Sequence, residues 1–172
     1  MMTRQFLGGA AIAFALIGTT PALAASTAPM TSKAMLLKPL TLTKLDDLDF
    51  GSIIPSGSGQ IVTIDANTGA RSSSYIAGLV PSDPGHRARF ASSGVNNTMV
   101  VLELSATPAD LTNADGKKMS LTGLQLDSGG VIRTLTPASQ VFFVGIGGTV
   151  FVRSNQEEGV YSGTFTLTAT YL

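Results

Sequence analysis

The chain has 172 residues, with 11 basic and 11 acidic side chains, one histidine and no cysteine. Without cysteine, disulfide bonds and thiolate metal sites are excluded, and a single histidine excludes a histidine-rich zinc site. The balanced charge, with no basic cluster, argues against nucleic-acid binding and against electrostatic attachment to a membrane.

The first 24 residues have the pattern of a secretory signal peptide. Arg4 precedes an apolar run from 6 to 17, and Ala22-Leu23-Ala24 supplies a small-x-small cleavage site. The run is too short to span a bilayer, and no second candidate span follows. We therefore predict cleavage after Ala24, with Ala25 as the alternative, and export to the periplasm, the cell surface or the medium.

Cleavage after Ala24 would leave 148 residues with 10 basic and 11 acidic side chains. That length suits one domain with a substantial core. Residues 25–37 are predicted to form a short N-terminal extension, and residues 38–172 a single domain. Weak alternation predicts the first strand from Leu36 to Lys44. Pro39 lacks a backbone N–H, so we expect it at a sheet edge or near the start of that strand.

Short alternating or apolar runs, separated by turn signals, predict the strands in the middle of the chain. Ile61 and Ile64 are expected to anchor the second of them, and the segment 99–105 is expected to be buried on both faces apart from Glu103. The predicted strands cover 60–65, 87–91, 99–105, 119–126 with a bulge at Gly123, 131–135, and two apolar runs within 141–152 separated by a bulge or bend at 145–148.

The last fourteen residues, 159–172, carry the clearest strand pattern in the chain. From Gly163 onward, small or apolar residues alternate with threonines. Successive side chains on a strand point to opposite faces, so this pattern predicts one buried face and one solvent face. No stretch of ten or more residues outside the signal peptide has helical spacing. The sequence therefore predicts an all-β protein, an antiparallel β-sandwich.

Few side chains suggest chemistry. Asp46, Asp47 and Asp49 invite a calcium site, but their spacing matches no known loop, and an acidic turn in which Phe50 plugs the core before a bend at Gly51 is favoured. Glu103 lies in an apolar strand, where an outward-facing carboxylate is a commoner explanation than a raised pKa.

The remaining motifs also favour a protein without catalytic, cofactor or metal residues. The glycines at 145–148 do not complete a phosphate-binding G-x-G-x-x-G pattern, and no helix follows them. His86 lies beside a turn, where a surface position is expected, and no G-x-S-x-G elbow accompanies it. We therefore predict that the protein is not an enzyme.

Two sets of motifs resemble known families. Gly159, fourteenth from the end, and the penultimate Tyr171, with alternating residues between, resemble the C-terminal signature of chaperone–usher pilin and spore-coat-protein-U-like subunits. The segments Pro39-Leu40-Thr41-Leu42, Leu48-Asp49-Phe50-Gly51, Val144-Gly145 and Gly159-x-Tyr161-Ser162-Gly163-Thr164-Phe165 are similar to the secreted domain-of-unknown-function family 4402 (DUF4402) over essentially the whole mature chain. These resemblances imply an immunoglobulin-like sandwich related to pilins, with chaperone or usher partners.

Two functions stay open at this point. The first is a structural or adhesive subunit of a surface fibre or coat that self-associates by β-strand addition. Its subunit-contact strand would present Gly159, Tyr161, Gly163, Phe165, Leu167, Ala169 and Tyr171, and its donor segment would present Met30, Ala34 and Leu36. The second is a monomeric exported binding module that uses its loops to hold carbohydrate or another envelope component.

Overall fold

The structure is a computed structural model that describes residues 31–105 and 110–172. The predicted signal peptide, its cleavage site and Met30 lie outside the described residues. Residues 36–172 form one compact unit, which contains every strand that the structure describes, and residues 31–35 lie outside that unit. No helix within the described part of the chain is long and apolar enough to cross a membrane.

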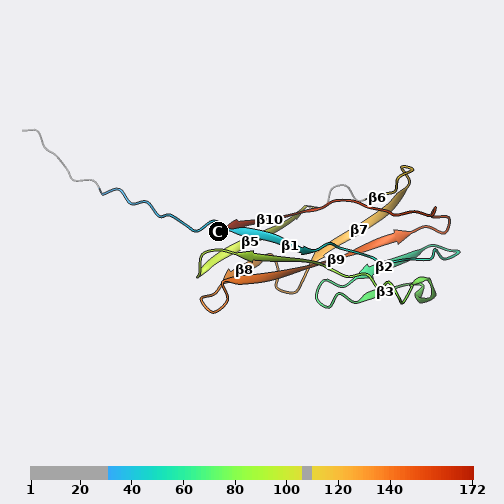
Figure 1. Cartoon of the computed structure of the whole chain (residues 1–172), viewed down its shortest axis with the longest axis horizontal. Helices are drawn as coiled ribbons and strands as arrows, with labels where there is room; N and C mark the ends of the chain where they lie inside the picture. The colour runs from blue at the N-terminus through green and yellow to red at the C-terminus, as the bar shows by residue number, and fades with distance from the viewer. Residues whose placement is uncertain (1–30, 106–109) are drawn as a thin grey trace, which may run out of the picture. The chain divides into compact units, whose positions relative to one another are not determined.

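The larger sheet is antiparallel and is built around one long strand, β9 (Val141–Val152). Strand β4 pairs with the first half of β9, and β2 and β7 flank its second half (Figure 1). β1 lies beside β4, β3 beside β2, and β6 beside β7. These strands are Thr41–Asp46 (β1), Gln60–Ile64 (β2), Arg71–Ser73 (β3), Ala88–Ser93 (β4), Asp110–Thr112 (β6) and Lys118–Leu126 (β7).

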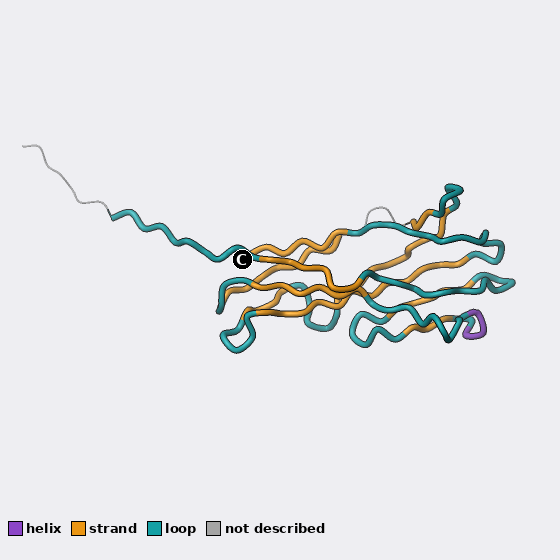
Figure 2. The backbone as a smooth tube through the Cα atoms, in the orientation of Figure 1, coloured by secondary structure: helices purple, strands orange, loops and turns teal. Residues whose placement is uncertain are grey.

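The smaller sheet has three antiparallel strands in the order β10-β5-β8. They span Thr98–Ser105 (β5), Ile132–Leu135 (β8) and Thr166–Tyr171 (β10). Figure 2 shows that strands and loops make up almost the whole trace, with one short helical turn at Ile76–Gly78. The expected all-β architecture is confirmed for the described residues.

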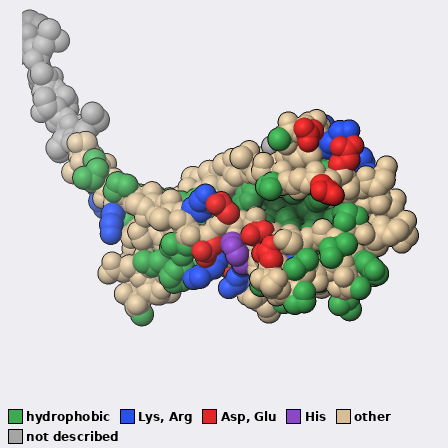
Figure 3. All heavy atoms as spheres, turned by 45° about the vertical axis from the view of Figure 1, so that its right-hand side comes forward, with side chains coloured by type: hydrophobic (Ala, Val, Ile, Leu, Met, Phe, Trp, Pro, Cys, Tyr) green, Lys and Arg blue, Asp and Glu red, His purple; other side chains and the backbone are tan. Residues whose placement is uncertain are grey.

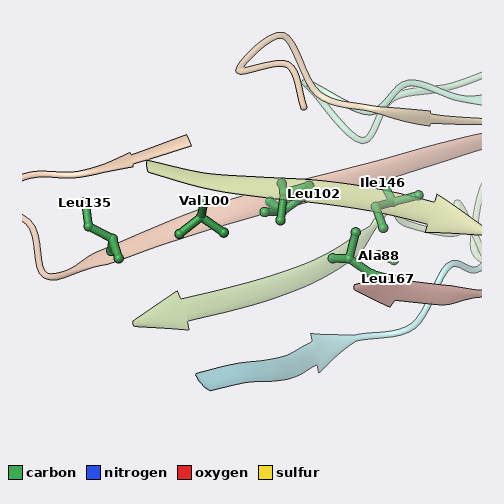
Figure 4. Close-up of a cluster of buried hydrophobic side chains, with 7 residues drawn as sticks. Ala88, Val100, Leu102, Leu135, Ile146 and Leu167 are labelled. Carbon is green, nitrogen blue, oxygen red and sulfur yellow. The ribbon is translucent and has the colours of Figure 1, made fainter. Parts of the chain in front are cut away.

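The two sheets pack face to face through a shared core, which is the arrangement of a β-sandwich. The main cluster takes residues from both sheets (Figure 4): Ala88, Val144 and Ile146 from the larger sheet, and Val100, Leu102, Leu135 and Leu167 from the smaller. A second cluster has only three buried members, Val62, Val150 and Val152. The core is therefore well filled at one end of the sandwich and thin at the other.

Two predicted strands begin more than two residues later in the structure. The first strand begins at Thr41, not at Leu36, because Pro39 has no N–H to donate and the carbonyl oxygen of Lys38 accepts a hydrogen bond from the hydroxyl of Tyr171 at 3.0 Å. β1 does lie at the edge of its sheet, as Pro39 predicts. The last strand begins at Thr166, so residues 159–165 lie outside it.

The prediction of a bulge or bend at 145–148 is wrong, because β9 runs through these residues without interruption and without a register shift. The glycines serve another purpose. A Cβ added to Gly145 would lie 2.4 Å from the carbonyl oxygen of Ala66. A Cβ added to Gly147 would lie 2.2 Å from the carbonyl oxygen of Ile64. Here the chain leaving β2 crosses closely over β9, and only glycine leaves room for it.

Two expectations about burial also need correction. Ile61 is half exposed and Val62 is buried, so the inward phase of β2 is Val62 and Ile64. In β5 only one face is buried, since Met99 is 52% exposed on the other. A run of apolar residues gives no alternation from which the solvent side of a strand can be read.

Several local predictions are confirmed. The register of β7 shifts between Leu121 and Gly123, which is the expected bulge. Gly51 has φ +66°, and the neighbouring Phe50 packs against the second core cluster.

Candidate functional site

The outer edge of β10 has no partner strand among the described residues. The N–H of Leu172 donates to the carbonyl of Met99, and hydrogen-bonded pairs alternate along an antiparallel ladder. Thr166, Thr168 and Thr170 therefore direct their backbone groups toward β5. Those of Leu167, Ala169 and Tyr171 point to the open side, so this edge presents donors and acceptors for another strand.

Tyr171 closes one end of this edge. Its hydroxyl donates to the carbonyl oxygen of Lys38 at 3.0 Å and accepts the N–H of Val95 at 2.8 Å. These bonds join the end of β10 to the residues that precede β1. The edges of the two sheets are thereby held together at the end of β10 where the chain reaches Tyr171.

At the other end of β10, the two edges separate and enclose a groove of about 970 Å³. One wall is the segment 47–55, which continues the edge of the larger sheet beyond β1. The other wall is the segment 156–165, which leads into β10. The floor consists of Leu111, Met119, Leu121 and Val152, from β6, β7 and β9.

The groove is apolar inside and incompletely filled. Phe50, Ile53, Leu111, Met119 and Leu121 surround the small second core cluster, yet each is only partly buried. Figure 3 shows apolar side chains gathered in a hollow with carboxylate-bearing side chains around it. An apolar surface of this kind, rimmed by polar residues, is typical of an interaction site.

Five carboxylate residues line the groove, and no lysine, arginine or histidine does. Two of them are paired with lysines outside the lining. Lys117 Nζ lies 2.6 Å from Glu157, and this hydrogen bond raises the pKa of Lys117 above its ordinary value. Lys44 Nζ lies 2.7 Å from Asp47. The other three are Asp49, Asp83 and Glu158.

Arg71 of β3 supports the first wall. Its guanidinium donates to the carbonyl oxygens of Phe50 at 2.9 Å, Ser52 at 3.1 Å and Val80 at 2.6 Å. The Ser52 hydroxyl also donates to Asp83 at 2.6 Å. The wall is thus attached to the body of the domain through backbone oxygens, which otherwise have few partners in an irregular segment.

The residues of the predicted contact strand fall into two groups. Leu167, Ala169 and Tyr171 lie in β10 and face the main core cluster, as their alternation predicts. Gly159, Tyr161, Gly163 and Phe165 lie in the groove wall that precedes β10. In the predicted donor segment, Ala34 and Leu36 are exposed and outside any strand, with Leu36 fully exposed.

Sequence reasoning missed the opposite wall and the floor. Phe50 and Ile53 lie about a hundred residues before 156–165. Met119 and Leu121 read as ordinary strand residues, and Leu111 lies outside every predicted strand. Their apolar character was visible, but no local pattern shows that they share one groove. Only the pairing of the strands brings them together.

The other candidate residues do not converge. Glu103 is exposed on β5, and His86 is exposed on a bridge opposite Asp49. Asp49 accepts the N–H of Gly51 at 2.8 Å, which is the geometry of an acidic turn. No group of three or more metal-ligating side chains occurs among the described residues.

The comparison with protein-family models gives one match. The model described as a domain of unknown function, DUF4402, matches residues 40–171. The chain belongs to the DUF4402 family. The DUF4402 match extends from the residue before β1 to the end of β10, so it includes both walls of the groove and its floor. Neither the search of curated proteins nor the search of solved structures gave a match.

Proposed function

We propose that this DUF4402 protein is an exported structural or adhesive subunit, without enzymatic activity, that assembles by β-strand addition. An extended segment of a neighbouring subunit pairs with the open edge of β10 and lays its side chains into the groove. Main-chain hydrogen bonds supply affinity in this mode of recognition, and the pockets between side chains set the register.

The observation that carries the proposal is the coincidence of an unpaired strand edge, along β10, with an unfilled apolar groove that adjoins the start of that strand. An exposed strand edge is a template for pairing with another chain, and proteins usually protect it. Along β10 the solvent face bears threonines, so the edge itself carries no charged side chain to block pairing.

The strand order supports an immunoglobulin-like topology for this sandwich. The order β1-β4-β9-β7 corresponds to strands A-B-E-D of an immunoglobulin domain, and β5-β10 corresponds to C-F. In a complete domain, a G strand pairs with F. The G position beside β10 is the one that the incoming segment occupies in this proposal, as in the pilin-like subunits that the C-terminal signature resembles.

The donor in this proposal is the N-terminal extension, residues 25–37, with Met30, Ala34 and Leu36 in phase. A partner chaperone or usher could occupy the same edge before assembly.

The first test is an unheated SDS gel of the protein from cell envelope and medium. A ladder that collapses to monomer on boiling is expected, because strand-addition contacts are kinetically very stable. Deletion of residues 25–37 should remove the ladder while circular dichroism still reports a folded β-protein. A single monomer band from the soluble, folded full-length chain would contradict assembly and favour the monomeric binding module.

A further inference from the structure

We propose that the acidic rim of the groove selects a positively charged donor, and that Lys33 of a second copy of this chain supplies the charge. This inference rests on the proposed function and names the electrostatic contact that fixes the donor in the groove. It is carried by the uneven distribution of charge between the two segments that would meet.

Three carboxylates on the groove side of the contact have no ion-pair partner among the described residues, and the nearby guanidinium of Arg71 is bonded to backbone oxygens of the wall. Of the groove's five carboxylate residues, Asp49, Asp83 and Glu158 form no salt bridge with any described residue. Asp49 and Asp83 accept hydrogen bonds from Gly51 and Ser52, which leave their charge in place. A concave apolar surface lined by one sign of charge concentrates its field on whatever enters.

The donor side has the opposite character. Lys33 is the only charged side chain between residues 25 and 37, and apolar residues follow it directly. Met35 is 81% exposed and Leu36 is fully exposed, so the segment offers apolar side chains that a groove could bury. An acidic segment would meet repulsion at the rim, which makes the rim a selectivity device as well as an attractive one.

The occupant is a second copy because Lys38, which directly follows the segment, is held at the wrong end of β10. The Lys38 carbonyl accepts a hydrogen bond from Tyr171, whereas the groove begins at Phe165, at the opposite end of β10. The six residues of β10 extend about 20 Å, which separates Lys38 from the start of the groove. The residue before a proline favours an extended backbone, so Lys38, followed by Pro39, opposes the reversal that self-docking needs.

A charge swap tests this contact in the full-length exported chain. Self-association is measured by sedimentation velocity at 50 mM and 500 mM NaCl for the wild type, Lys33→Glu, Glu158→Lys and the double variant. Each single change should weaken association about three- to ten-fold at low salt, and the double variant should recover most of the loss. The differences should shrink at high salt, where the charges are screened.

Glu103→Lys is the matched control, because Glu103 is an exposed carboxylate outside the groove lining. It should associate like the wild type. If the wild type assembles but the single changes have no effect, or the swap recovers nothing, the rim contact is overturned and strand addition stands. If the double variant changes only the melting temperature of a monomer, the segment docks in its own chain and the contact with a second copy is overturned. A wild type that stays monomeric at all concentrations overturns both proposals.

Discussion

Gly147 lies where the chain after β2 crosses over β9. A Cβ there would lie 2.2 Å from the carbonyl oxygen of Ile64 and 2.5 Å from the backbone nitrogen of Ala66, and backbone atoms cannot move aside easily. We expect Gly147→Ala to lower the free energy of unfolding by about 1–3 kcal/mol in urea titrations. Gly123→Ala is the control, since an added Cβ meets nothing within 4 Å. A loss at Gly123 equal to that at Gly147 would contradict the crossing.

Arg71 gives a second residue-scale prediction. Arg71→Met keeps the length of the side chain but removes two hydrogen bonds to the wall, at Phe50 and Ser52, and a third to the carbonyl oxygen of Val80. We expect a loss of about 1–3 kcal/mol in the free energy of unfolding. Arg89→Met is the comparison, because Arg89 forms only an exposed 3.5 Å pair with Asp46, worth about 0–1 kcal/mol. Similar losses for the two variants would count against a role for Arg71 in holding the wall.

At the scale of the element, β10 permits a test that separates folding from assembly. The N–H of Ala169 points to the open edge, so Ala169→Pro removes no ladder bond to β5, and proline is tolerated on such an edge. Thr168→Pro removes an N–H that faces β5 and should cost about 3 kcal/mol or more. We expect Ala169→Pro to fold but to give no ladder on an unheated gel. A ladder from folded Ala169→Pro would exclude pairing along this edge.

The turn between β2 and β3 gives a prediction about pH. The backbone N–H of Thr68, at 2.7 Å, followed by its hydroxyl, at 2.9 Å, lowers the pKa of Asp65 below its ordinary value of 3.8. A carboxylate with a lowered folded-state pKa stabilises the fold above its unfolded pKa, and the contribution is lost as the pH falls through the folded pKa. The stability difference between wild type and Asp65→Asn should therefore shrink below pH 3.8, measured by urea titration at pH 6 and pH 2.5. A constant difference would show that the charge of Asp65 is not involved.

At the scale of the whole molecule, the two core clusters predict uneven stability. The well-filled end holds seven buried apolar residues, and the end beneath the groove holds three. Amide hydrogen exchange of the monomer should therefore be faster in β6 and in residues 118–121 of β7 than in β4. Assembly should slow exchange at the groove end, since a ligand that binds only the native state stabilises it. Uniform exchange in the monomer would contradict this picture.

Local sequence patterns predict much of this fold but do not predict the groove. The alternation of Leu167, Ala169 and Tyr171 with threonines predicts their inward face correctly, and the turn at Gly51 is readable from the sequence. The predicted ends of strands were less accurate. Before β1 begins, the carbonyl oxygen of Lys38 accepts a hydrogen bond from the hydroxyl of Tyr171, which is 133 residues away in the sequence. The glycines of β9 were misread because the chain that crosses them belongs to another part of the sequence.

The sequence by itself determined the fold class and the inward face of the last strand, since side-chain alternation is a property of neighbouring residues. Tertiary structure alone decided which strand edge stays open and where the groove lies. Its walls, 47–55 and 156–165, meet only after the strands have paired. Backbone pairing joins residues far apart in the chain, and a linear pattern records which face a side chain takes but not which neighbour its backbone finds.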